Sequence, residues 1–186
     1  MLALGYPGGP VIDQLAEFGD SQAVRFGEPK MKGNPFDFSF SGIKTAVLYH
    51  LRKHTELHAE IEAREQALAR GERKAEQLRS LLTKPTLDLI ASFQRSVVSD
   101  LITRTLAAAE QFAARSVLVS GGVAANRQLR RSFEEEAQLR RLEVFFPSRA
   151  LSTDNAAMIA AAAYPKFLAG ERADAQLNAE ANLPLA

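Results

Sequence analysis

Two short apolar runs rich in β-branched residues, each followed by a helical pattern, most limit the possible folds of this chain. The first run is Ser116–Ser120, which a Gly-Gly pair follows, and the second is Leu142–Phe146, which stops at Pro147. Both are typical of strands, and a helix between them would join parallel neighbours. Two parallel strands alone make a poor sheet, so the pattern indicates an α/β fold with strands missing.

Helical periodicity covers most of the remaining chain, because apolar residues recur there at spacings of three and four. We expect helices at Val11–Phe18, Ile43–Leu82 with a break near Gly71, Thr86–Ala113, Ala125–Leu139 and Ala156–Leu168. Residues 27–42 form a loop-like stretch, within which Phe36–Phe40 alternates like a short strand or an extended packing segment. The predicted fold class is therefore α/β but helix-rich, with two short parallel strands and several helices.

One charged segment stands out. His54–Arg79 is rich in Glu, Arg, Ala and Gln and poor in large apolar residues, so we expect an exposed helical hairpin rather than core. His50, His54 and His58, the three histidines of the chain, recur at the spacing of one helical face. That spacing can bring two imidazoles to one zinc ion, but the charged surroundings favour a solvated face without function.

Composition narrows the classes of function. The chain contains no cysteine, which excludes disulfides, thiolate metal sites and cysteine nucleophiles and fits a reducing compartment. The net charge of +1 leaves any nucleic-acid surface to a local patch. No apolar run approaches the roughly 20 residues that cross a bilayer, and no signal peptide is evident. We expect a cytoplasmic protein without membrane contact.

A strand that ends in paired glycines and opens a helix, Ser120–Asn126, is the first candidate site. The glycines let a ligand approach the backbone, and the helix N-terminus suits an anion or a nucleotide. Asn126 is expected in the first helical turn, where its amide could bond a ribose or phosphate. The plain alternative is a tight connection without a ligand, and no Gly-Lys-Ser/Thr follows, which excludes a Walker A loop.

Two carboxylates give further candidates. Asp154 precedes the Ala-rich helix, where Thr153, Asp154 and Asn155 could act as an ordinary N-cap or present a metal-binding carboxylate. Asp13 lies one helical turn beyond Gly9, from where it could accept hydrogen bonds from ribose hydroxyls or remain a surface residue.

Basic residues could form an RNA-binding patch. Those near the glycine turn are Arg127, Arg130, Arg131, Arg140, Arg141 and Arg149, and Lys30, Lys32 and Lys44 flank the loop. Glu134–Glu136 interrupts the run, so an ordinary solvated helix face is the alternative.

Five motifs occur in order along the chain: Leu4–Pro10, Phe38–Ala46, Ala91–Gln94, Gly121–Arg127 and Thr153–Ile159. This ordered set closely resembles the C-terminal half of the TsaD family, once labelled glycoprotein endopeptidases. The resemblance implies the ASKHA architecture shared by actin, heat-shock chaperone ATPases and sugar kinases. It also implies transfer of threonylcarbamoyl from threonylcarbamoyl-AMP to N6 of the tRNA adenosine 3′ of the anticodon.

The resemblance also assigns residues and partners. The family's nucleotide-substrate contacts fall on Gly9, Asp13 and Asn126, and its metal-binding aspartate falls on Asp154. The metal would be one divalent ion per full-length subunit, iron or alternatively zinc, and its histidine ligands belong to an N-terminal lobe that this chain lacks. Expected partners are threonylcarbamoyl-AMP or an ATP-like nucleotide, tRNA, an inactive ASKHA paralogue and a P-loop ATPase subunit. No catalytic residue is assigned.

The expected organisation is an incomplete second ASKHA lobe over residues 1–170, with a charged helical insertion at about 53–84, and a polar tail over 171–186. Because the histidine ligands and a substrate loop are absent, we expect the chain alone to be inactive. The alternative is a non-catalytic ASKHA-fold paralogue that acts as a partner subunit. A metalloprotease is disfavoured because no His-Glu-x-x-His motif occurs.

Overall fold

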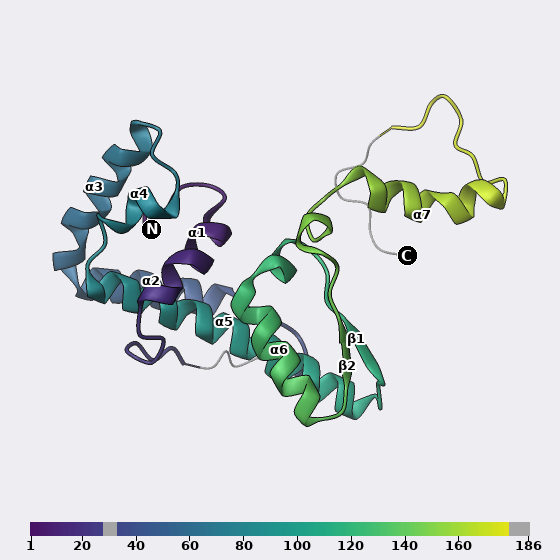
Figure 1. Ribbon diagram of the computed structural model, residues 1–186, viewed down its shortest axis with the longest axis horizontal. Coiled ribbons are helices and arrows are strands. Elements are labelled where there is room, and N and C mark those ends of the chain that lie inside the picture. Colours follow the sequence, from purple (N-terminus) through teal and green to yellow (C-terminus); the bar gives the residue numbers. More distant parts are fainter. Residues whose placement is uncertain (28–32, 179–186) are drawn as a thin grey trace.

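A long central helix organises the chain in the computed structural model, which describes residues 1–27 and 33–178 (Figure 1). The helices and strands are α1 (Gly8–Leu15), α2 (Ser41–Lys53), α3 (His58–Ala69), α4 (Ala75–Arg79), α5 (Lys84–Gln111), β1 (Ser116–Leu118), α6 (Arg127–Leu139), β2 (Glu143–Phe145) and α7 (Ala156–Leu168). The helix-rich α/β class predicted from the sequence is confirmed.

Helix α5 confirms the strongest periodic pattern of the sequence. Pro85 lies in its first turn, where a missing backbone N–H costs nothing, and the helix continues for 28 residues. Its buried side chains contact different partners along its length. Leu87 and Ile90 pack in one hydrophobic cluster near the N-terminal end, while Ile102 and Leu106 belong to another near the C-terminal end.

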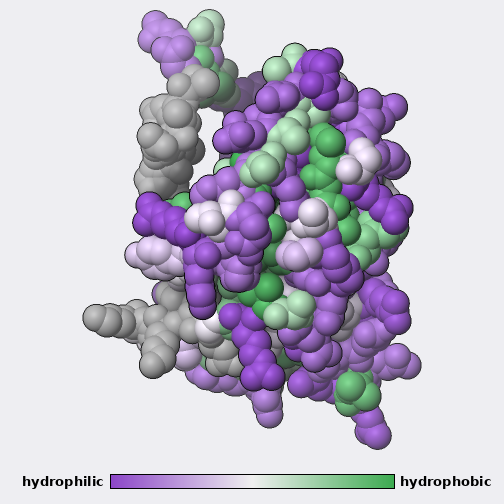
Figure 2. All heavy atoms as spheres, turned by 90° about the vertical axis from the view of Figure 1, so that its left-hand side faces the viewer, coloured by the Kyte–Doolittle hydropathy of each residue, from purple (hydrophilic) through white to green (hydrophobic). Residues whose placement is uncertain are grey.

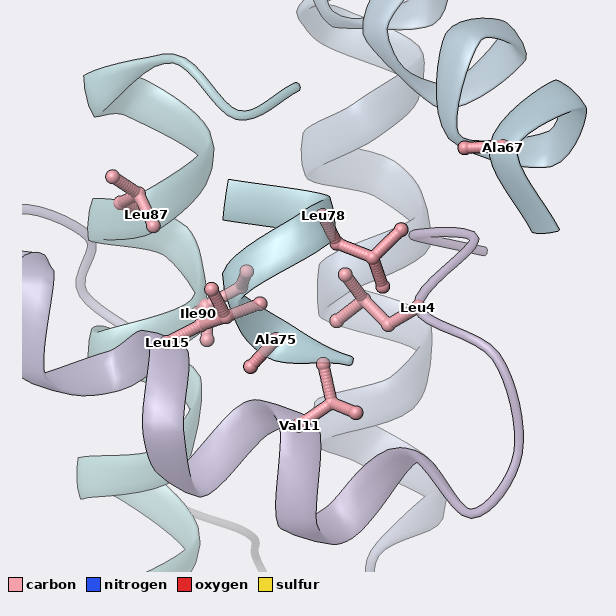
Figure 3. Close-up of a cluster of buried hydrophobic side chains, with 8 residues drawn as sticks. All are labelled: Leu4, Val11, Leu15, Ala67, Ala75, Leu78, Leu87 and Ile90. Atoms are coloured by element: carbon pink, nitrogen blue, oxygen red, sulfur yellow. The ribbon is translucent and has the colours of Figure 1, made fainter. Parts of the chain in front are cut away.

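The first cluster joins helices α1, α3, α4 and α5 with the N-terminal segment (Figure 3). It consists of Leu4, Val11, Leu15, Ala67, Ala75, Leu78, Leu87 and Ile90. Leu15 and Leu78 are almost completely buried, at 1% and 0% exposed. Removing such side chains from water is the main stabilisation of a small domain, about 1.5–3 kcal/mol for each large apolar residue.

The prediction that His54–Arg79 forms an exposed hairpin rather than core is wrong for the inner face of this segment, although most of its residues are exposed. The chain does turn at Gly71, as expected, and forms the two helices α3 and α4. However, Leu57, Ala67 and Leu78 are buried, and so is the charged side chain of Arg64. Figure 2 faces the side on which α3 and α4 lie in Figure 1 and shows mostly hydrophilic residues, so the apolar contribution of the segment lies inward.

The two strands pair in parallel, as predicted, with Val117 opposite Val144. Helix α6 connects them and packs Leu129 and Phe133 into the second cluster, while the ring of Phe146 meets that of Phe133 edge-on at 6.2 Å. The outer face of the first strand is open, because Leu118 is 78% exposed. Within the described residues the sheet has only these two strands.

The segment before α2 contains no strand among its described residues. Phe38 and Phe40 stack with ring centroids 6.3 Å apart, and Phe36 packs 6.0 Å from Phe112, so the alternating pattern reports packing rather than strand pairing. Lys30 and Lys32 lie outside the described residues.

Helix α7 is the outlier of the fold. It begins where the sequence predicts, Asn155 caps it by accepting a hydrogen bond from the N–H of Met158 at 2.9 Å, and Gly170 follows it with φ 78°. No residue of α7 is buried, and the helix stands apart from the other elements in Figure 1. In the described part of the chain, no helix combines the length and apolarity needed to cross a membrane. Of the predicted tail, residues 179–186 fall outside the described ranges.

Candidate functional site

A cavity of about 920 Å³ lies between the α1 region and the loop that follows β1. Three of the four site residues predicted from the sequence line it, namely Gly9, Asp13 and Asn126. Gly9 and Asp13 come from α1, whereas Asn126 is more than 110 positions away in the chain. The fold therefore brings together candidates that the sequence could only nominate one at a time.

Asp13 joins the two walls of the cavity. Its Oδ2 accepts a hydrogen bond from Nε of Arg127 at 3.0 Å, and its Oδ1 accepts one from the backbone N–H of Arg127 at 3.2 Å. Glu17 pairs with the same guanidinium at 2.7 Å. The hydrogen bond to Asp13 raises the pKa of Arg127. The carboxylate thus holds α1 against the start of α6, and its oxygens retain lone pairs that could accept further donors.

Asn126 is the N-cap of α6 rather than part of its first turn, because a 3-10 turn at Gly122–Ala125 delays the helix. Its Oδ1 accepts the N–H of Leu129 at 2.8 Å, and its Nδ2 donates to Oε1 of Gln94 at 2.9 Å. Gln94 is 6% exposed and donates in turn to Gln128 at 3.0 Å. This amide chain fixes Asn126 at the cavity wall from the middle of α5.

We expect Asn126→Ala to lower the free energy of unfolding by about 0.5–2 kcal/mol, because α6 loses its cap and Gln94 loses a donor. Urea denaturation followed by far-UV circular dichroism measures the change. Asn155→Ala is the matched control: it removes the cap of α7, which has no buried residue, and should alter global stability by less than about 0.5 kcal/mol. Equal effects of the two substitutions would contradict the structural role assigned to Asn126.

Glycines leave open space at the cavity wall. Gly121 has φ 90° and ψ 172°, a conformation that is essentially restricted to glycine. A Cβ atom added at Gly9 or Gly122 would meet no atom within 4 Å, so the protein itself does not fill the space beside them. The backbone at both positions is therefore open to a ligand.

Asp154 is not brought into the cavity. Its neighbour Thr153 lines the wall, but Asp154 itself is exposed and does not. Across residues 1–27 and 33–178, no three His, Cys, Asp or Glu side chains come together as a metal site would require. The described residues therefore do not fit a complete metal centre by themselves.

The histidine face considered from the sequence does not exist as one helical face. Helix α2 ends at Lys53 and His58 begins α3, so the helix is interrupted at His54. The rings of His50 and His54 stack at 4.3 Å, and burial together with the neighbouring charge of His54 lowers the pKa of His50. His54 Nδ1 contacts Glu56 at 2.9 Å.

Comparison with known proteins identifies the family to which this chain belongs. A protein-family model described as tRNA N6-adenosine threonylcarbamoyltransferase, TsaD, matches residues 1–161. The chain belongs to the TsaD family. A tRNA N6-adenosine threonylcarbamoyltransferase of Koribacter versatilis is 54% identical over 200 aligned positions, which cover all of this chain and 52% of that protein.

Other members of the TsaD family show the same partial coverage. The transferase of Anaeromyxobacter sp. is 42% identical over 97% of this chain and 47% of its own length. That of Moorella thermoacetica is 40% identical over 100% of this chain and again 47% of its own length. The chain thus spans about half the length of the curated relatives it matches. Members of the family are transferases that modify tRNA.

The basic cluster proposed for RNA is largely committed to internal contacts in this TsaD-family chain. Arg130 donates to the carbonyls of Ala124 and Pro147 and lies over the ring of Phe146. Arg131 and Arg140 pair with Glu135 and Glu136 one helical turn away. With Arg127 engaged by Asp13, four of the six arginines already contact other groups of the chain, and for Arg131 and Arg140 the pairs are the exposed ones of an ordinary solvated helix face.

Sequence reasoning missed Arg79, which lines the same cavity from the end of α4. Its guanidinium carbon lies 3.6 Å from the centroid of the Phe18 ring. Arg149 lines the cavity as well, although the sequence placed it only in the general basic cluster. The contact of Arg79 with Phe18 joins residues 61 positions apart, so no local spacing could have revealed it.

Proposed function

We propose that this chain forms part of a transferase that moves threonylcarbamoyl from threonylcarbamoyl-AMP to N6 of the adenosine 3′ of the anticodon in tRNA. We further propose that it supplies part of the second lobe of an ASKHA fold and acts in the cytoplasm. The observation that carries the proposal is the convergence of Gly9, Asp13 and Asn126 on one cavity of about 920 Å³. These are the positions to which the family resemblance assigns nucleotide contacts.

In the proposed reaction, N6 of the adenosine forms a bond to the carbamoyl carbonyl carbon, and the bond from that carbon to the phosphate oxygen breaks to release AMP. N6 gives up one of its two protons in the same reaction, so the products are the modified tRNA, AMP and a proton released to solvent. The residues of this chain would contribute by holding the nucleotide part of the donor. The backbone at Gly9 and Gly122 is open to close approach, and the Asp13 carboxylate can accept hydrogen bonds from ribose hydroxyls. Such positioning lowers the entropic part of the barrier.

A metal ion, iron or alternatively zinc, is proposed with Asp154 as one ligand. Because the described residues do not fit a full site, the remaining ligands would have to come from another part of the protein. A P-loop ATPase subunit and an inactive paralogue of the same fold are proposed partners. These rest on the family resemblance alone.

The test is an assay of the chain alone and of the chain co-expressed with the part of the Koribacter versatilis transferase that the match leaves out. Both samples receive tRNA and threonylcarbamoyl-AMP, and mass spectrometry of the digested tRNA detects the modified adenosine. We expect product only from the pair. Product from the chain alone would contradict the expected incompleteness. No product from the pair, with stimulation of the full-length relative by the chain, would favour the non-catalytic paralogue.

Within the active pair, we expect Asp13→Asn to reduce kcat/KM about 10- to 100-fold, because a hydrogen bond to a charged group contributes about 1.5–3 kcal/mol. Asp174→Asn, in the polar segment after α7, is the matched control and should leave the rate unchanged. Circular dichroism spectra of both variants verify the fold, since Asp13 also holds Arg127. An unchanged rate for Asp13→Asn would remove Asp13 from the substrate contacts.

A further inference from the structure

The 53–84 segment supplies one wall of the cavity. Ala75, Glu76 and Arg79 of α4 line it together with Gly9 and Asp13. Figure 3 shows Ala75 pointing from α4 toward α1, which carries Val11 and Leu15, while the side chain of Leu78 lies beside Leu4. Because Leu78 is fully buried in this cluster, the residue that follows it, Arg79, is held at a fixed place at the cavity wall.

Arg79 is also held from the side. The guanidinium carbon lies 3.6 Å from the centroid of the Phe18 ring, so one face of the planar group is covered by an aromatic surface. Stacking of this kind leaves the N–H groups at the edge of the guanidinium available to acceptors. The contact therefore orients Arg79 without consuming its hydrogen-bond donors.

The arginines that line the cavity differ in whether a carboxylate forms an ion pair with them. Arg127 pairs with both Asp13 and Glu17. For Arg79 and Arg149, by contrast, no carboxylate lies within ion-pair distance among the described residues, although Glu76 lines the same wall. Two guanidinium groups thus line the cavity without an ion-pair partner among the described residues, which leaves their donors available to an anionic group of the ligand between the α4 wall and the loop after β1.

We propose that Arg79 binds the phosphate group of the nucleotide that occupies this cavity. The inference rests on the proposed function, since it takes the ligand to be a nucleotide, and it gives the charged segment a role in substrate binding. A phosphate is the preferred acceptor because the planar fork of an arginine can donate two parallel hydrogen bonds to two phosphate oxygens. Lysine would offer only a point charge at the same position.

The experiment is isothermal titration calorimetry of the co-expressed pair described above with two probes, AMP and adenosine, which differ only in the phosphate. We expect Arg79→Gln to weaken AMP binding about 10- to 100-fold and to change adenosine binding by less than about twofold. Arg79→Lys should recover part of the AMP affinity. Arg73→Gln, an exposed arginine of the same segment that does not line the cavity, is the matched control.

The outcomes separate this inference from the proposed function. Unchanged AMP binding by Arg79→Gln, or equal losses for AMP and adenosine, would overturn the phosphate contact while leaving a nucleotide site. A wild-type pair that binds neither probe would contradict the nucleotide cavity itself and the role of Arg79 with it. Since the Arg79 side chain is exposed, its replacement should not unfold the chain, and circular dichroism verifies this.

Discussion

Replacing Arg64 with methionine will lower the free energy of unfolding by about 3–5 kcal/mol, the cost of breaking a buried ion pair from one side. The side chain of Arg64 is 0% exposed and pairs with Glu60 at 3.1 Å. It also donates to the carbonyl oxygens of Leu2 and Leu81, each at 2.9 Å. One guanidinium therefore connects the N-terminal segment, α3 and the residues just before α5.

Methionine would leave two carbonyls without their donor and Glu60 without its cation. Burial raises the pKa of Glu60, but hydrogen bonds from Thr83, Thr86 and Arg64 outweigh it and lower the pKa overall, so the carboxylate stays charged. Urea denaturation measures the loss of stability. Arg70→Met is the control, because Arg70 pairs with Glu72 at the surface and should cost less than about 1 kcal/mol. A loss below that value for Arg64→Met would mean that the segment is peripheral after all.

Replacing Gly19 with alanine is the second severe change that we expect. Gly19 has φ −105°, which any residue can adopt, so the constraint is not conformational. An added Cβ atom would lie 2.1 Å from the backbone oxygen of Leu87 and 2.9 Å from Cβ of Ala91. Since backbone atoms of α5 cannot rotate away, the chain after α1 must move off the helix. Overpacking of this kind costs about 1–3 kcal/mol or more.

The displacement would also strain the hydrogen bonds that follow Gly19. The Ser92 hydroxyl donates to the carbonyl of Asp20 at 3.2 Å and accepts the N–H of Val24 at 3.1 Å. Gly27→Ala is the matched control, since a Cβ atom there meets nothing within 4 Å. Thermal unfolding should show a clear loss for Gly19→Ala and little or no loss for Gly27→Ala. Similar melting temperatures for the two variants would show that the close approach to α5 is relieved without cost.

The sequence predicted those elements whose signal is local. The period of α5, the strand character of 116–120 and the break at Gly71 all depend on neighbouring residues, and the structure contains each of them. The burial of α3 and α4 was not predictable in this way. The buried positions of these two helices are Arg64, Ala67, Ala75 and Leu78, so only one is a large apolar residue, and a buried arginine reads as exposed in any hydropathy pattern. The residues whose carbonyls accept hydrogen bonds from Arg64, Leu2 and Leu81, are 62 and 17 positions away in the chain.

The candidate site was likewise predictable only where its signal is local in the sequence. Glycine spacing and helix starts nominated Gly9, Asp13 and Asn126 from local sequence, and the fold places all three at one cavity. The contacts of these residues with Arg127 and Gln94 arise only from the tertiary fold. Asp154 illustrates the limit, because its position depends on α7, and no residue of that helix is buried within the described structure.

Both walls of the cavity pack against a single helix, α5. Helix α5 carries α1 and α4 on its N-terminal half through Leu87 and Ile90, and carries α6 on its C-terminal half through Ile102 and Leu106. Gln94 stands between the two halves and holds Asn126. Helix α5 is about 42 Å long at 1.5 Å per residue. A slight bend of α5 near Gln94 would move the two walls apart or together, so the width of the cavity depends on the curvature of a single helix.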